Sequence, residues 1–461
     1  MGIYLRSYVK PITCFLIASL MGILFLVFKT PPVRRDSAGW RAAGVELSGN
    51  GFGVVSSRRF ELIALRPAYP MFVGICYTVF GKHDNAVRVV QVLLSALVAV
   101  LVYSFARRYY GENVGFTAGL LYSFCMTCAH YPGFFLTDNL IVFLFVLSCW
   151  LVMKAIDTES ILIAACVAVS LTITSLTKPV FLFLGPFVVL MLVIFSRKHF
   201  NWNGRLIGMM TIIALLPIIF FSGWLYRMHK HNPVIMSSGG GIGYNLLYNG
   251  SELALSDKEK AARLIGLMSR NLAEKIFPDI DFRTLWPYPA VVQKLIENAD
   301  RKYSQLPNRK DRYLQMALDL YKEHPFGYFI NRITTLIRLN AFQYPSRLNE
   351  TDRWKDFYNR GNNKSSLVII LDLVLKSMTN PFVWFLFGIV VMKRKKLPIL
   401  PILLPVLYIN IVYCLLDGIP RYGLPALPFY LIGGAVLFYF GIKFLKDKWL
   451  SSRRIIAKSA G

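Results

Sequence analysis

The feature that most constrains this chain is a succession of apolar runs, each close to the length that crosses a membrane. A helix rises about 1.5 Å per residue, so about 20 apolar residues span the hydrocarbon core of a bilayer. A mean hydropathy of +0.48 and 55% hydrophobic residues exceed what a soluble core needs. We therefore predict an all-α integral membrane protein with about ten transmembrane helices. The expected spans are 11–28, 88–106, 114–131, 139–154, 161–176, 180–196, 206–225, 367–392, 398–415 and 424–442.

The formal charge of +27 reflects basic residues at the ends of apolar runs. When the spans alternate, most of these clusters fall on one side, which the positive-inside rule assigns to the cytoplasm. This arrangement argues for topology and against nucleic-acid binding, and it places both termini in the cytoplasm. The first run has no small-residue cleavage site behind it, so we expect a retained helix and no signal peptide. The clusters are Arg107-Arg108, Arg197-Lys198, Lys393-Arg394-Lys395-Lys396 and the basic tail from Lys443 to Lys458.

The spans divide the chain into three parts. Residues 1–225 form a transmembrane core whose first outer loop, 29–87, lies between the first two spans. Residues 226–366 are polar and long enough for a small outer lobe, and residues 367–461 return to the membrane and end in the basic tail. The run from Tyr69 to Phe80 is too short to cross, so we expect it to dip into the outer leaflet or lie on it.

Helical spacing also appears within the expected lobe. Ser256 to Lys275 and Asp311 to His324 combine this spacing with mixed charge. Phe326 to Leu339 interleaves apolar positions with two arginines, which suits a helix at the membrane surface.

Charged side chains recur at the outer ends of the spans. Asp36 follows the first span, Asp138 and Lys178 occupy two outer turns, and Arg421 occupies a third. A charge at the membrane border is costly unless it is solvated or paired, so a group of them indicates a functional site. Ordinary explanations remain open for each: lysine and arginine reach headgroups, Asp138 caps a helix, and Asp36 pairs with Arg34 and Arg35.

A resident metal or cofactor is not expected. No second carboxylate stands beside Asp36, and hard cations need several oxygen ligands. The seven cysteines lie in or beside apolar runs, where a thiol behaves as a small hydrophobe.

This set of charges suits one chemistry in particular. Moving a sugar from a polyprenyl phosphate to a hydroxyl by single displacement needs a base for the acceptor's proton and cations for the departing phosphate. A second acid for the leaving group is unnecessary, in contrast to a glycosidase.

The order of motifs resembles the GT-C glycosyltransferases. The first outer loop reads Asp36-Ser37-x-x-Trp40-x-x-Ala43-x-x-Leu47-x-Gly49-x-Gly51-Phe52, then Arg66-Pro67-x-Tyr69-Pro70. It is followed by Arg88-x-x-Gln91, Tyr103-x-x-x-Arg107-Arg108, Leu136-Thr137-Asp138, Thr177-Lys178-Pro179 and Arg421-Tyr422-x-x-Pro425-x-x-Pro428. The pattern is most similar to the bacterial branch that acts on lipopolysaccharide sugars, and to relatives that transfer aminoarabinose to lipid A or mannose to protein.

The resemblance implies an inverting transferase of the bacterial inner membrane, with its site facing the periplasm and a polyprenyl-phosphate sugar as donor. It implies Asp36 as the base or acceptor-positioning carboxylate and Asp138 as a second acid that orders the loop or the sugar. Lys178 and Arg421 would lie near the donor phosphate, and Arg66 would shape the first loop. Weaker expectations for sugar contacts are Tyr69 and Tyr244. Ser37 replaces the second acid of an Asp-Glu doublet, which argues against a protein acceptor.

The acceptor is expected to be an anionic glycolipid such as lipid A or lipopolysaccharide, because outer-loop arginines are abundant. General attraction to lipid headgroups would produce the same bias. Two other functions remain open. A lipid-linked sugar flippase would place ionisable groups near the midplane and often show repeats. An envelope polymerase or ligase would use a polyprenyl-diphosphate glycan.

Overall fold

All regular structure that we describe is helical, as the apolar runs predict. The structure is a computed structural model. It describes residues 2–33, 36–51, 60–196, 204–231, 255–268, 270–281, 290–306, 309–341, 380–416 and 420–459, together with isolated positions at 243, 246–247, 250, 253 and 378.

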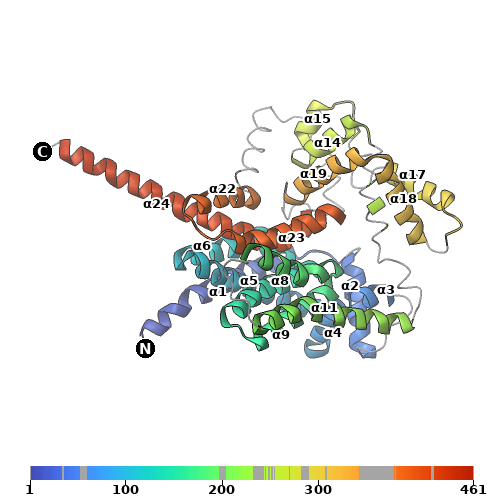
Figure 1. The fold of residues 1–461 in the computed structure, drawn as a ribbon, viewed down its shortest axis with the longest axis horizontal. Helices are drawn as coiled ribbons and strands as arrows, with labels where there is room; N and C mark the ends of the chain where they lie inside the picture. Colours follow the sequence, from blue (N-terminus) through green and yellow to red (C-terminus); the bar gives the residue numbers. More distant parts are fainter. Residues whose placement is uncertain are drawn as a thin grey trace.

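The helices of the first half form one bundle (Figure 1). Helix α5 is central, because it packs against α1, α6 and α8. Helix α9 packs between α8 and α11. The bounds are α1 Gly2–Lys29, α2 Asp36–Asn50, α3 Phe60–Leu65, α4 Ala68–Phe80, α5 Asp84–Tyr110, α6 Glu112–Ser123, α7 Met126–His130, η1 Tyr131–Gly133, α8 Thr137–Thr158, α9 Ile161–Thr177, η2 Pro179–Phe183, α10 Leu184–Ser196 and α11 Gly204–His231.

The second half adds a lobe and three more apolar helices. In the lobe, α14 packs on α15 and α17 on α18, while α19 contacts α14, α18 and the apolar helix α23. Helix α24 packs against α22 and α6 and then projects away from the bundle to the C-terminus (Figure 1). The bounds are α14 Asp257–Met268, α15 Arg270–Ile276, α17 Ala290–Lys302, α18 Arg309–Glu323, α19 Pro325–Ala341, α22 Pro381–Arg394, α23 Leu400–Leu416, η6 Pro420–Ala426 and α24 Leu427–Ser459.

Several helices are apolar enough for a multi-pass membrane protein. Five described helices are long and apolar enough to cross a bilayer: Tyr8–Phe28, Asp84–Tyr110, Thr137–Thr158, Gly204–Lys230 and Arg421–Asp447. Shorter apolar helices occupy Ala68–Phe80, Ile161–Thr177, Pro179–Met191 and Leu400–Leu416. The total of about ten crossings therefore stays a prediction.

The structure divides three stretches that the sequence suggests are continuous. The run 114–131 is interrupted, because α6 ends at Ser123 and the chain continues through α7 and the short η1. The run 180–196 begins as η2, because Pro179 offers no amide hydrogen to the preceding helix. The expected helix from Ser256 to Lys275 is two helices, α14 and α15.

Two packed regions support the candidate site. The larger core joins α5, α6, α8, α9, α23 and α24 through buried residues such as Phe105, Phe145 and Phe429. A second, smaller cluster joins the first loop to the bundle through Trp40, Tyr69 and Phe135. The first-loop helices α2 and α4 are therefore packed onto the bundle at the level where α5 and α8 begin.

Candidate functional site

Asp138 lies at the first turn of α8, where the preceding segment is held firmly. Phe134, Phe135 and Leu136 are buried, and Leu136 is extended before the helix begins. Asp138 Oδ1 accepts a hydrogen bond from Lys178 Nζ at 3.0 Å. The carboxylate therefore belongs to a buried ion pair.

Lys178 lies between α9 and η2. Pro179 disfavours helical geometry at the residue before it, and Lys178 is extended, with φ −147° and ψ 110°. The turn directs its side chain inward, and only 8% of the residue is exposed. Lys178 does not reach out to the headgroups, so that explanation is wrong.

Two tyrosine rings surround the Lys178 ammonium. Nζ lies 4.2 Å from the ring centre of Tyr422 and 5.6 Å from that of Tyr413, and these two rings stack at 4.9 Å. An aromatic face attracts a cation, so the rings stabilise the charged form of lysine. Tyr422 belongs to the motif Arg421-Tyr422-x-x-Pro425, but its role and that of Tyr413 could not be predicted, because stacking between α23 and η6 has no local sequence signal.

Burial acts against the charge of Lys178. Burial lowers the pKa of Lys178 to about 8, and Arg421 and Arg66 act in the same direction, while Asp138 opposes them. Arg66 thus lies close enough to Lys178 to repel it. An anion placed among these cations would favour the protonated lysine.

Arg421 connects the C-terminal part of the chain to the first loop. Its Nη2 donates a hydrogen bond to Asp36 Oδ2 at 3.2 Å, across 385 positions of sequence. The guanidinium lies 5.4 Å from the ring centre of Tyr422. Asp36 is the first residue of α2 and its side chain is 62% exposed. Arg34 and Arg35, the other expected partners of Asp36, lie outside the described residues.

Tyr69 is buried beside this cluster and bound to α5. Its hydroxyl donates a hydrogen bond to Gln91 Oε1 at 3.1 Å, and its ring meets that of Trp40 edge to face at 5.8 Å. A side chain so enclosed, with 0% exposure, supports the packing of α4 more directly than a contact with sugar. Tyr244, the other expected sugar contact, lies outside the described residues.

The motif Arg88-x-x-Gln91 holds the two loops that present the acids. Arg88 donates hydrogen bonds to the carbonyls of Gly133 and Pro31, each at 3.0 Å. Gln91 Nε2 donates to the carbonyls of Pro132 at 2.8 Å and Phe134 at 2.9 Å. These buried bonds fix the segment before Asp138 and the segment before Asp36. The sequence shows the motif but not this role, because its partners are backbone carbonyls far away in the chain.

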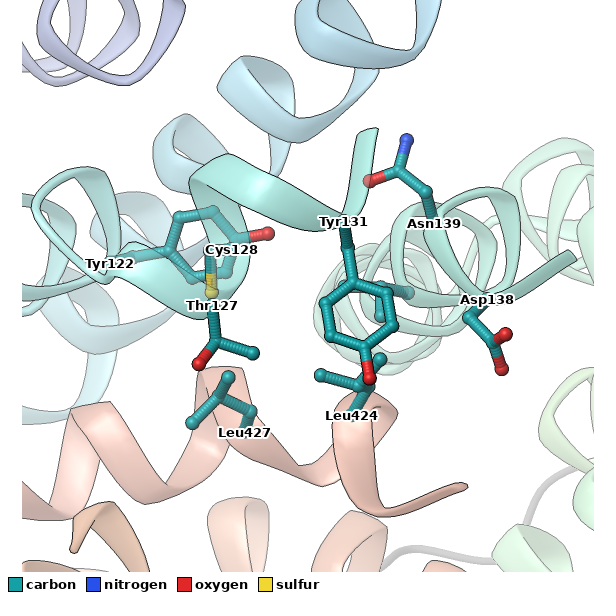
Figure 2. A pocket seen from close by; sticks show the side chains of 9 residues that line it. Tyr122, Thr127, Cys128, Tyr131, Asp138, Asn139, Leu424 and Leu427 are labelled. Atoms are coloured by element: carbon teal, nitrogen blue, oxygen red, sulfur yellow. The ribbon is translucent and has the colours of Figure 1, made fainter. Parts of the chain in front are cut away.

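A small pocket lies behind Asp138, between α6, α7, α8 and the α24 end of the bundle. Its lining includes Thr127, Tyr131, Asn139 and Leu427, and Figure 2 shows the Asp138 carboxylate at its edge, directed away from the other lining side chains. The charged groups of Lys178 and Arg421 are not part of this lining. Among the described residues, no group of three histidine, cysteine or acidic side chains is arranged to hold a metal ion.

The site therefore combines two carboxylates with three cations. Asp36 is accessible, Asp138 is buried, and Lys178, Arg421 and Arg66 leave a net charge of one positive unit among these five side chains. Two donors, Arg421 Nε and Tyr413 Oη, are buried without a hydrogen-bond partner among the described residues. Such a surplus of positive charge and hydrogen-bond donors favours an anion with several oxygens.

Residues 66–226 match the family model described as dolichyl-phosphate-mannose-protein mannosyltransferase. This match confirms the resemblance to the GT-C glycosyltransferases over a segment that includes Arg66, Tyr69, Asp138 and Lys178. No curated protein sequence matches the chain significantly.

Two solved structures are similar at low sequence identity. The oligosaccharyltransferase AglB from Archaeoglobus fulgidus, in complex with an inhibitory peptide and a dolichol-phosphate, is 12% identical, with a TM-score of 0.48 over 97% of this chain and 52% of its own. ArnT from Cupriavidus metallidurans bound to undecaprenyl phosphate is 14% identical, with a TM-score of 0.41 over 95% of this chain and 78% of its own. The chain thus spans about half the length of the archaeal protein.

Proposed function

We propose that the chain is an inverting glycosyltransferase using a polyprenyl-phosphate sugar, a class supported by the match of residues 66–226 to the mannosyltransferase family model. The donor class is that of the matched family, whose members are described as using a dolichyl-phosphate sugar. The observation that supports this function best is the accessible Asp36 carboxylate beside a buried cationic cluster, linked to it through Arg421.

Each member of the cluster has a part in the proposed reaction. Asp36 accepts the proton of the acceptor hydroxyl, and the oxygen then attacks the anomeric carbon of the donor sugar. The bond between that carbon and the phosphate oxygen breaks, and its electron pair stays on the departing polyprenyl phosphate. Lys178, Arg421 and Arg66 stabilise the charge that develops on this phosphate. Because a phosphate leaves readily, no general acid is required.

Asp138 serves Lys178 and not the substrate in this scheme. Its carboxylate accepts a hydrogen bond from the ammonium and favours the protonated form of Lys178. Asp138 is therefore a positioning residue, and Asp36 alone acts as the base.

The acceptor that we propose is an anionic envelope glycolipid reached from the periplasmic side of a bacterial inner membrane. Basic residues of the first loop support an anionic partner, although Arg41 is already paired with Asp84. The others are Arg34, Arg35, Arg58, Arg59 and Arg66. Lipid A or lipopolysaccharide is the candidate of this class, and the transferred sugar is a hexose or a pentose.

The base assignment predicts a selective loss in Asp36→Asn. Transfer of labelled sugar from the lipid donor should fall by about 10²- to 10⁴-fold, the usual contribution of a general base. Binding of the donor should persist, because the asparagine removes no cation. The measurement is product formation in detergent, with donor binding determined separately by equilibrium titration.

A matched control is Asp279→Asn in the lobe. Asp279 is also paired with a basic residue, Lys258, and its side chain is 61% exposed, against 62% for Asp36. This variant should retain full transfer. Full activity in Asp36→Asn would refute the assignment of the base.

The proposed donor separates this function from its alternatives. Mass spectrometry of lipid bound to the purified protein should find a polyprenyl monophosphate with a single sugar. A diphosphate-linked glycan would favour a polymerase or ligase, and donor flipping in vesicles without product would favour a transporter.

A further inference from the structure

The lobe helix α19 has its polarity reversed relative to a helix of a soluble domain. Six large apolar side chains share one face, at spacings of three and four residues, and all are exposed. Their exposed fractions range from 39% to 75%, and the six are Phe326, Phe329, Ile330, Ile333, Leu336 and Ile337. We call them the α19 stripe.

The opposite face of α19 is polar and buried against the protein. Asn331, Arg332 and Thr335 are 5%, 7% and 0% exposed. Arg332 Nη1 donates hydrogen bonds to the carbonyls of Cys414 at 2.8 Å and Leu415 at 3.1 Å, which lie at the C-terminal end of α23. These carbonyls lack partners within their own helix, and a guanidinium there also complements the helix dipole.

A second contact holds the C-terminal end of α19. Asn340 donates to Asn410 Oδ1 at 2.5 Å, Asn410 donates to Tyr430 Oη at 3.0 Å, and Tyr430 donates to Asn340 Oδ1. This closed ring of buried hydrogen bonds joins α19 to α23 and α24. The orientation of α19, with the stripe outward, is therefore determined by specific polar contacts.

We propose that the α19 stripe lies in the outer leaflet of the membrane and is covered by phospholipid acyl chains. Water would favour the opposite rotation of the helix, because exposing contiguous apolar side chains is unfavourable. The stripe also continues an apolar surface, since α23 exposes Ile411 and Leu415 beside the carbonyls that Arg332 binds.

A protein partner fits this surface less well than lipid. Protein interfaces contain about one hydrogen bond per 100–200 Å² and a polar rim, whereas none of the six side chains of the stripe offers a donor or an acceptor. Acyl chains need neither. Helix α19 thus anchors the lobe in the membrane, and because it also contacts η6, it links the membrane surface to the segment that contains Arg421.

The test measures the surroundings of the stripe directly and does not depend on sugar transfer. A genetically encoded ketone residue labelled with a nitroxide avoids the seven native cysteines. Labels replace Phe326, Phe329, Ile333 and Ile337, one at a time, in the full chain in nanodiscs of phosphatidylethanolamine and phosphatidylglycerol. Matched controls are Leu314 and Leu318 of α18, which are 38% and 40% exposed.

Oxygen partitions into hydrocarbon, whereas a water-soluble nickel chelate does not. The ratio of oxygen accessibility to nickel accessibility should be several-fold higher at the four stripe positions than at the two controls. Equal ratios at stripe and control positions would place the stripe in water and overturn the proposal. Exclusion of both reagents would show that protein covers the stripe and would also overturn the proposal. Dipolar broadening between labels on two copies of the chain would identify that protein as a second copy.

Discussion

Lys178 is the residue whose protonation state matters most for the proposed donor site. Its folded pKa is about 8, against 10.5 for the unperturbed side chain, because burial disfavours the ammonium. Above pH 8 the free protein would lose this charge while an unfolded chain keeps it. Unfolded chains then bind more protons, so this group makes folding more favourable as pH rises from about 8 to 10.5.

Donor affinity should change in the opposite direction. We predict that the KM for the lipid donor rises as pH increases from about 7 to 9, since a neutral amine attracts phosphate weakly. Initial rates across that range measure the effect. In Lys178→Arg, the guanidinium stays protonated, so the rise should disappear. An equal rise in both variants would assign the titration to another group.

The ion pair of Asp138 and Lys178 predicts different outcomes for stability and activity. Removing one partner of a buried pair leaves an uncompensated charge and costs about 3–5 kcal/mol. Asp138→Asn and Lys178→Met should therefore each lower the free energy of unfolding by about that amount. The double variant contains neither charge and should recover most of the loss.

Sugar transfer should remain low in that double variant, because the phosphate has lost a cation. Thermal unfolding in detergent measures the stability of the variants, and the transfer assay measures their activity. A double variant less stable than either single one would show that the pair does not act as a unit.

At the scale of elements, helices α22 and α24 approach each other closely at two glycines. A Cβ added at Gly388 would collide with the carbonyl oxygen of Gly433, and one added at Gly433 would lie 2.9 Å from the Cα of Phe385. Small residues allow such close approach of helices within a membrane. The two glycines thus position α24, which follows directly on the segment that contains Arg421.

We predict that Gly388→Ala lowers stability by about 1–3 kcal/mol, the usual effect of overpacking. The midpoint of thermal unfolding in detergent measures it. Gly441→Ala, in the partner helix α24, is the control, because nothing lies within 4 Å of an added Cβ there. It should be neutral or slightly stabilising. Equal loss in both variants would point to backbone effects and not to the contact.

Apolar runs allow the position of most elements to be predicted, but not their interruptions. Helix α19 was expected at 326–339 and spans Pro325–Ala341, and α4 was expected at 69–80 and spans Ala68–Phe80. The break after Ser123 was missed, because hydropathy averages over it. The membrane-surface prediction for 326–339 implies an apolar face on α19, but periodicity alone does not give the direction in which that face points.

At the scale of the whole molecule, alternation of the spans explains why four distant residues could be predicted to share one end of the bundle. It could not show that Asp36 binds Arg421 or that Asp138 binds Lys178, because these pairs depend on how the helices pack. Arg88 and Gln91 illustrate the same limit, since their partners are backbone carbonyls that no residue type reveals.

The bond between Asp36 and Arg421 also determines a sequence of events. The hydrogen bond from Arg421 occupies Asp36 Oδ2, and a donor phosphate competes for the same guanidinium. We predict compulsory-order kinetics in which the lipid donor binds first. An inert acceptor analogue should then inhibit uncompetitively with respect to donor, whereas noncompetitive inhibition would indicate random binding.

Such an order would have a protective effect. Asp36 Oδ2 is released only after the phosphate has drawn Arg421 away, so an acceptor that arrives early meets a carboxylate still bound by arginine. The contact between Asp36 and Arg421 would then make the base dependent on donor binding, which limits wasteful turnover of an activated sugar.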